Sequence, residues 1–184
     1  MKTPWFVTPS GEVLPIEPED WLFEPGSWAE VGEALGTALP SDYKALIGDG
    51  RACIFDDELL ITSPFDANPH ANLVYHAARA SWALAHLRAH NPDPEFGAVL
   101  AYPEQGGLLS WGVDGGGGTY HWDTLHPDPD QWTIYIEGRP LDPDVERHAL
   151  SLTGYLDALR RGEVKGAALS HWPGPNPVIR RVDG

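Results

Sequence analysis

The sequence predicts an α+β fold, and three observations support this prediction. Apolar residues recur at helical spacing in the first half of the chain and again in one segment near its end. Residues 96–138 instead show a succession of short strand patterns separated by Pro and Gly turns. With 184 residues, 42% of them hydrophobic, and 8 Trp, the chain can fill one core, so a single domain over 1–184 is expected.

The N-terminal segment 1–26 is expected to form a hairpin or an extended arm, because two short apolar runs flank a Ser-Gly turn. The segment SWAEVGEALG then predicts a short amphipathic helix. Ser27 and Glu30 have the spacing of a capping box, and Gly36 suits the helix exit.

A second short helix is predicted in LPSDYKALIGDG, with Pro40 at its start and Gly48 at its end. The runs ACIF and ELLIT follow as two strands joined by a short acidic turn. Cys53, the only cysteine, lies within the first of these runs and is expected to be a buried core thiol.

The longest helical pattern follows, with Asn68 as its cap and Pro69 in its first turn, and it continues as far as Asn91-Pro92. Apolar residues recur along it at spacings of three and four: Leu73, Ala77, Ala80, Leu84 and Leu87. From residue 96 the period changes to that of strands, in FGAVLAY, GGLLSWGVD, TYHWDT and QWTIYIEG.

A final helix is predicted in SLTGYLDALRRGE, with Leu152, Tyr155, Leu156 and Leu159 facing inward. Two arginines stand at its carboxyl end, where positive charge is favourable, and Gly162 follows them. The remaining residues, 164–184, form a proline-rich tail that is expected to be extended.

Four consecutive glycines in LLSWGVDGGGGTYHWDT raise the question of phosphate binding. A P-loop needs Lys and Ser or Thr after its glycines, and a dinucleotide fingerprint needs separated glycines that open a helix. Here the glycines lead into a strand, so they are expected to turn a hairpin. Alternation would then place Leu109, Trp111 and Val113 on one face of the hairpin, with Trp111 and Trp122 as core or cleft residues.

Charge is the strongest compositional signal, since 27 acidic and 12 basic residues give a net charge of −15. Direct nucleic-acid binding is therefore not expected. Two interpretations stay open: in one the acids only keep the protein in solution, and in the other an acidic face attracts a basic protein partner. The chain shows no signal peptide, no membrane-length apolar stretch and no cysteine pair, which together favour the cytoplasm.

The order of these motifs resembles the SUKH superfamily, which contains many bacterial immunity proteins and a fungal regulator of cell-wall synthesis. The resemblance covers residues 28–163. Its most telling part is a central Trp-Gly with an Asp and a glycine-rich turn, an aromatic strand, and the segment Asp128-Pro129-x-x-Trp132. It implies a SUKH-like α+β fold, with a mostly antiparallel central sheet of about five to six strands wrapped by helices.

The resemblance also implies a function: a bacterial cytoplasmic immunity protein that binds and neutralises a cognate protein toxin, such as a nuclease. No catalysis, cofactor or membrane contact is expected for such a protein. A regulatory or scaffold protein of the same fold stays an alternative.

For a basic toxin, the expected binding residues are loop carboxylates beside the sheet, together with one aromatic anchor. They are Asp56, Asp57, Glu58, Asp114, Tyr120, Asp123, Asp128 and Asp130. The competing interpretation is that these acids cap turns and solubilise the protein.

A metal-dependent enzyme is the remaining alternative. His121 and Asp123 lie two residues apart on one strand face and His126 follows in the loop, so the three could approach a metal ion. The competing interpretation is a half-exposed strand with ordinary polar residues. Ser110 lacks the glycine that a nucleophile elbow needs two residues before it, and no catalytic residue is assigned.

Overall fold

A computed structural model describes residues 23–90, 99–138, 145–164 and 177–182, together with two short strands at 6–7 and 13–14. The helices are α1 (Trp28–Leu35), α2 (Ser41–Ile47), α3 (Leu73–His90) and α5 (Leu152–Arg160), with 3-10 turns η2 (Pro69–Ala71) and η3 (Pro129–Gln131). The strands are β1 (Phe6–Val7), β2 (Val13–Leu14), β3 (Cys53–Phe55), β4 (Leu59–Ile61), β5 (Leu108–Asp114), β6 (Thr119–Asp123), β7 (Thr133–Glu137), β8 (Val145–His148) and β9 (Ile179–Arg181).

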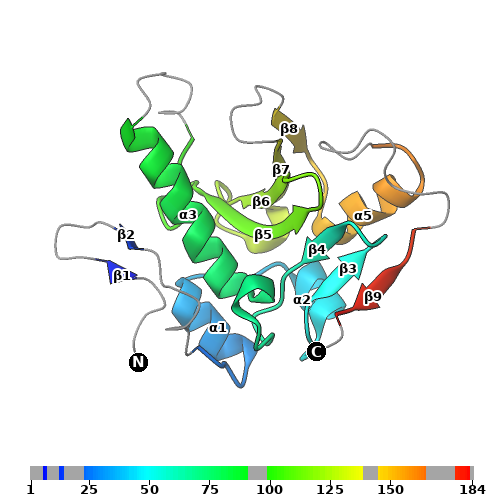
Figure 1. Cartoon of the computed structure of the whole chain (residues 1–184), viewed down its shortest axis with the longest axis horizontal. Coiled ribbons are helices and arrows are strands. Elements are labelled where there is room, and N and C mark those ends of the chain that lie inside the picture. The colour runs from blue at the N-terminus through cyan, green and yellow to red at the C-terminus, as the bar shows by residue number, and fades with distance from the viewer. Residues whose placement is uncertain are drawn as a thin grey trace.

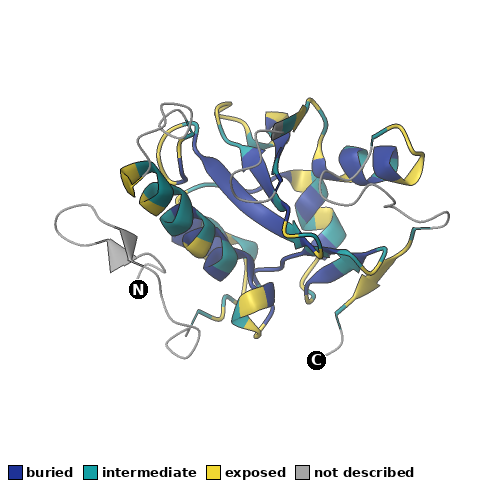
Figure 2. Ribbon diagram, turned by 45° about the horizontal axis from the view of Figure 1, so that its top comes forward, coloured by how far each residue is buried: buried dark blue, intermediate teal, exposed yellow. Residues whose placement is uncertain are grey.

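The α+β prediction is confirmed. Strands β3 to β9 form one antiparallel sheet in the order β8-β7-β6-β5-β4-β3-β9, and β1 and β2 form a separate antiparallel pair (Figure 1). The helix α3 runs along β5 on one face of the sheet, while α2 and α5 pack on the other. Burial follows this arrangement, since β5 is almost wholly buried and the edge strand β9 is exposed (Figure 2).

The core on the α2–α5 face is built from aromatic rings of both layers. Tyr43 of α2 meets Trp122 edge to face at a ring distance of 5.0 Å, and Tyr155 of α5 lies 6.2 Å from Tyr120. Trp111 and Trp122 are both buried, which confirms them as core residues. Such aromatic pairs contribute more than the area that they bury.

The first helix begins and ends where the sequence predicts. Ser27 accepts a hydrogen bond from the Glu30 amide, and Gly36 adopts a left-handed conformation (φ 75°) that closes the helix. The Glu30 carboxylate, however, accepts from the amide of Gly26 at 2.6 Å, one residue before the position that a capping box requires.

The long helix begins later than predicted. Asn68 caps only the 3-10 turn η2, because the backbone of Asn72 is extended and separates this turn from α3. The side-chain oxygen of Asn72 accepts from the amides of Val74 and Tyr75, so Asn72 is the cap of α3. Its side-chain nitrogen donates to two backbone carbonyls of the preceding loop, which fixes the helix start against the sheet.

The sheet has seven strands where about five to six were expected. The polar strand β8 and the tail strand β9 were not predicted, and both occupy edges. The predicted strand over 96–102 falls partly outside the described residues, and within 99–102 the structure has only an isolated bridge between Ala101 and Leu108. Edge strands bury little apolar surface, which explains why hydrophobic alternation did not reveal β8 and β9.

The glycine run turns the β5–β6 hairpin, as predicted, but the alternation of β5 is interrupted. The register with β6 pairs Ser110 with His121 and then Gly112 with Tyr120, which leaves Trp111 without a partner on β6. The predicted shared face of Leu109, Trp111 and Val113 is therefore wrong for Val113. The extra residue moves Val113 to the face that Ser110 occupies.

Gly112 allows a close approach between β5 and β4. A Cβ atom at this position would lie 2.7 Å from the carbonyl oxygen of Leu60 on β4. We expect Gly112→Ala to lower the free energy of unfolding by about 1–3 kcal/mol, because the two strands must separate to admit a methyl group. Urea unfolding measures this loss. Gly26→Ala, whose Cβ meets only a flexible carboxylate oxygen at 3.6 Å, is the control, and an equal loss in both variants would contradict the assignment.

Candidate functional site: two acidic ends and a groove

The predicted acidic binding residues do not form one surface. The segment Asp56–Glu58 and Asp114 lie at one end of the sheet, where Gly115 donates to the carbonyl of Glu58 at 3.0 Å. At the far end of β6 lie Asp123, the last residue of that strand, and Asp128 and Asp130, which follow in the next loop. A partner would therefore contact one end or the other.

At the first end, the acids are turn residues. Asp56 and Asp57 have positive φ angles of 52° and 58°, a conformation that Asp tolerates better than most residues. Asp57 forms an ion pair with Arg180 of β9, which balances its charge within the chain. Glu58 is partly buried beside the glycine turn.

Asp114 and Tyr120 are not presented at the surface, so the expectation that Asp114 offers an exposed carboxylate is wrong. Asp114 is 5% exposed and Tyr120 is 0% exposed. One oxygen of Asp114 accepts from the amides of Gly116 and Gly118, and the other accepts from the hydroxyl of Tyr120 at 2.9 Å. Burial raises the pKa of Tyr120, so it remains a donor to the carboxylate. The pair organises the glycine turn.

At the second end, carboxylates hold a loop in place, and two of them, Asp128 and Asp130, stay exposed. Asp128 accepts from the amide of Asp130 and starts η3, and Asp130 accepts from the amide of Ser41 at 2.6 Å, which ties η3 to α2. Asp123 is largely covered and pairs with Arg147 at 3.3 Å. The hydrogen bond from Ser41 lowers the pKa of the Asp130 carboxyl, so it stays ionised at neutral pH.

The same loop carries Leu125, the most exposed of the large hydrophobic side chains in the described part of the chain, at 75%. The loop is fixed on both sides of it. Thr124 bonds twice to the carbonyl of Gly107, and the ring nitrogen of Trp132 donates to the carbonyl of His126 at 2.7 Å. A rigid loop can present an apolar side chain without an ordering cost on binding.

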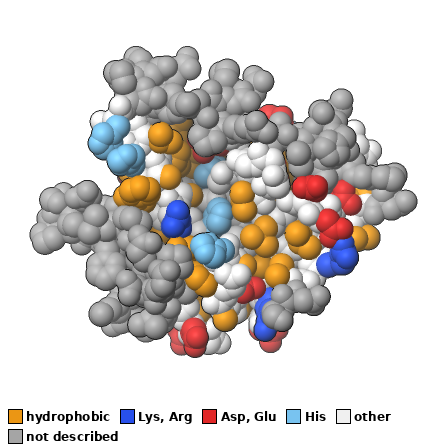
Figure 3. All heavy atoms as spheres, viewed as in Figure 1, with side chains coloured by type: hydrophobic (Ala, Val, Ile, Leu, Met, Phe, Trp, Pro, Cys, Tyr) orange, Lys and Arg blue, Asp and Glu red, His pale blue; other side chains and the backbone are white. Residues whose placement is uncertain are grey.

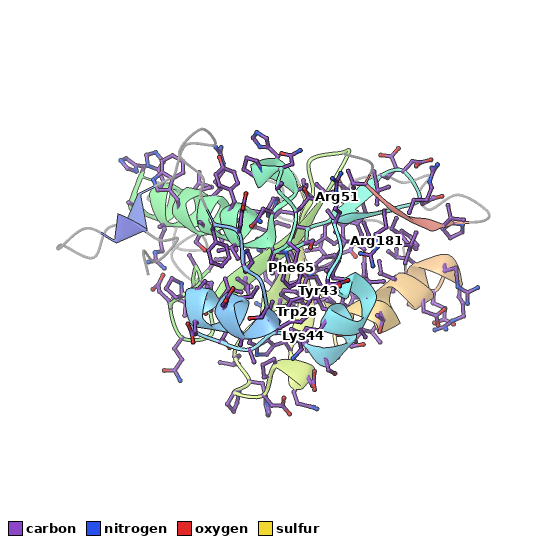
Figure 4. The ribbon with its side chains drawn as sticks, turned by 90° about the horizontal axis from the view of Figure 1, so that it is seen from below. Trp28, Tyr43, Lys44, Arg51, Phe65 and Arg181 are labelled. Carbon is purple, nitrogen blue, oxygen red and sulfur yellow. The ribbon has the colours of Figure 1, made fainter. Side chains whose placement is uncertain are left out.

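A groove of about 470 Å³ lies between α1 and α2. Residues that line it include Trp28, Gly32, Glu33, Gly36, Leu39 and Lys44. We call it the α1–α2 groove. Figure 4 shows Trp28 and Lys44 close together between the two helices, with Tyr43 and Phe65 next to Trp28. Trp28 meets both rings edge to face, at 5.9 and 4.9 Å, so a half-buried indole is held rigidly at the groove.

The groove and the acidic loop adjoin each other. Asp130 caps the start of α2, Lys44 lies in the following turn, and the charge of Lys44 contributes to the lowered pKa of Asp130. Glu33 lies on the α1 side of the groove. Sequence reasoning missed Trp28, Glu33 and Lys44 as site residues, because only the packing of the two short helices brings them together.

The three candidate metal ligands are not brought together. His121 is buried within the sheet, whereas His126 is exposed in the loop and bonds to Asp128. Among the residues described, no group of three or more His, Cys, Asp or Glu side chains is placed to hold a metal ion.

His121 instead has neighbours that sequence reasoning did not connect with it. Its Nε2 lies 3.3 Å from a carboxylate oxygen of Glu137, and on the adjacent strand Ser110 contacts Nδ1 of His76 at 3.0 Å. The register pairs Ser110 with His121 and His121 with Tyr135, and Glu137 lies two residues further along β7. The docking of α3 against β5 adds His76.

Cys53 is confirmed as a buried thiol. Burial raises the pKa of its thiol, an effect that the nearby Arg181 guanidinium opposes.

Comparisons of the chain with protein-family models, with curated proteins and with solved structures find no match. Within the described ranges, no helix has the length and apolar character needed to cross a membrane.

Proposed function

We propose that this chain is an immunity-type protein that binds and blocks a basic protein toxin, and that the α1–α2 groove with its neighbouring loop is the docking surface. The observation that carries the proposal is a half-buried Trp28, packed between two aromatic rings, in a groove that the carboxylate of Glu33 lines, with Asp130 bonded to the start of the adjoining helix α2. The resemblance of the motif order to SUKH immunity proteins supports the same function.

The chemistry of this surface suits a cationic partner. A guanidinium or ammonium group can lie over an indole face and against a carboxylate at the same time. Tryptophan is also among the residues that most often dominate binding energy at interfaces. Charge is complementary as well, since the chain carries a net charge of −15 and a nuclease must present a basic surface to phosphates.

Protection of cells and binding kinetics test the proposal. Co-expression of this chain should restore growth to cells that produce a toxin encoded beside it, and the purified pair should associate at a rate that falls with salt. Growth arrest despite co-expression, together with no binding, would contradict the immunity function.

Two triple variants of equal charge then locate the surface. Replacement of Glu33, Asp128 and Asp130 by Gln, Asn and Asn keeps the capping oxygens but removes three charges beside the groove. Replacement of Asp56, Asp57 and Glu58 by Asn, Asn and Gln removes three charges at the other end of the sheet. We expect the first variant to slow association several-fold more than the second, because screening limits charge effects to about 10 Å. Equal rates for both variants, or a larger effect of the second, would contradict this docking surface.

A further inference from the structure

The last turns of α3 carry three aromatic side chains that stack on one another. They are Trp82, His86 and His90, and their spacing of four residues places them one above the other on one side of the helix. The ring centres of Trp82 and His86 are 5.2 Å apart, and those of His86 and His90 are 4.1 Å apart. Both histidines are exposed, and Figure 3 shows histidine side chains gathered at the surface where α3 ends. We call His86 and His90 the α3 histidine pair.

Hydrogen bonding leaves the ring nitrogens of this pair available to a ligand. A backbone carbonyl can only accept, so Nδ1 of His90 carries a proton and donates to the carbonyl of His86 at 2.8 Å. In a neutral imidazole the lone pair then lies on Nε2, and a bond of this kind normally orients a metal-binding histidine. Within the described part of the chain, the ring of His86 makes only stacking contacts.

The stack also holds the two imidazoles near the geometry of a chelate. The half-buried indole of Trp82 lies against the outer face of the His86 ring, with 24° between the two planes, and limits its rotation. Two nitrogens that each bind one ion at about 2.0–2.1 Å lie roughly 3–3.4 Å apart. The imidazole rings have their centres 4.1 Å apart and are inclined by 30°, so small rotations of the exposed side chains reach this spacing.

The charge at this end of α3 favours a cation. The carboxyl end of a helix carries a partial negative charge, and the whole chain has a net charge of −15. Arg88, two residues from each histidine, lies on a different side of the helix and pairs with Glu104 at 2.8 Å. Its charge is therefore balanced within the chain and does not oppose a cation at the α3 histidine pair.

We propose that His86 and His90 chelate one divalent transition-metal ion, with water in its remaining coordination positions. Two histidines four residues apart on one helix can bind the same ion, and imidazole ligands suit Zn²⁺, Cu²⁺ and Ni²⁺ rather than Mg²⁺ or Ca²⁺. Among the described residues no third ligand joins the pair, so the ion stays open to a further ligand. Neither histidine lines the α1–α2 groove, and the site does not depend on toxin binding.

Isothermal titration calorimetry of the full chain with Cu²⁺, Zn²⁺ and Mg²⁺ at neutral pH tests this proposal. We expect saturable binding of Cu²⁺ and weaker binding of Zn²⁺, and no response to Mg²⁺, which prefers oxygen ligands. NMR of the histidine ring nitrogens locates the site. At stoichiometric Zn²⁺ the signals of His86 and His90 should shift before those of single exposed histidines such as His70 and His126.

Variants separate a chelate from binding by single histidines. His86→Gln and His90→Gln each leave one imidazole and should weaken Cu²⁺ at least about tenfold, because the second contact is lost. Arg88→His combined with His90→Gln keeps the number of histidines but moves the second ring to a different side of the helix. This double variant should bind as weakly as His90→Gln. His70→Gln should bind as the wild type does.

Three results would overturn the proposal. One is the absence of any saturable response of the wild type to Cu²⁺ and Zn²⁺. Another is an undiminished affinity in both His86→Gln and His90→Gln, which would place the ion elsewhere. The third is full affinity in the double variant, which would show that the spacing is irrelevant. Both histidines are exposed, so melting temperatures close to that of the wild type should exclude a loss of fold as the cause of weaker binding.

Discussion

Replacing Trp111 with alanine is expected to lower the free energy of unfolding by about 3–5 kcal/mol. Trp111 is 0% exposed and packs against Tyr120 and Trp122, with ring distances of 5.4 and 6.1 Å. Its ring nitrogen makes no hydrogen bond to the described residues, so the loss reflects packing and the cavity alone. Trp111→Phe keeps part of the ring, so its free energy of unfolding should fall by less than that of Trp111→Ala. Urea unfolding followed by circular dichroism measures both values.

The matched control is Leu125→Ala, because Leu125 is a large apolar residue that stands in solvent. Its removal should change stability by no more than about 0.5 kcal/mol. If the urea unfolding curve of Trp111→Ala coincides with that of the wild type, the indole is not part of the core.

The second large effect is a loss of stability in acid that depends on His76. Burial, followed by the charges of His121, Arg79 and His70, lowers the pKa of His76 to about 4, whereas a histidine in the unfolded chain titrates near 6.5. The native state therefore binds fewer protons than the unfolded state between these two values. Stability is unaffected above the unfolded pKa and falls as the pH drops from about 6.5 towards 4, by about 3 kcal/mol in total.

Chemical unfolding at a series of pH values measures this slope. His76→Gln removes the titrating ring, so its stability should fall less steeply than that of the wild type across the same window. His90→Gln controls for the loss of a histidine from the same helix. Parallel slopes for the wild type and His76→Gln would refute the assignment.

Local patterns in the sequence were enough to predict the helices and the central hairpin. Ser27, Gly36 and Ser151 act as caps in the structure because capping depends on groups within one turn of the chain. The four glycines turn a hairpin for a similarly local reason: the residues on either side of them have strand periodicity, and no helix follows.

The candidate site could be predicted only in part. The sequence identified Asp128 and Asp130 as acids of one loop, and the structure places both at the start of η3. It also suggested that Asp114 and Tyr120 face a partner, whereas these two residues bond to each other inside the hairpin. Composition and spacing do not show which carboxylates accept hydrogen bonds from within the chain and which remain free to contact a partner.

The sequence alone thus determined the α+β class, the helix limits apart from the start of α3, and the role of the glycine run, since each depends on neighbours along the chain. Tertiary structure alone decided the edge strands β8 and β9, the groove between α1 and α2, and the meeting of His76 with Ser110, which are 34 residues apart. These features depend on strand register and on how helices dock against the sheet. Both are set by the packing of the whole core, which no local pattern encodes.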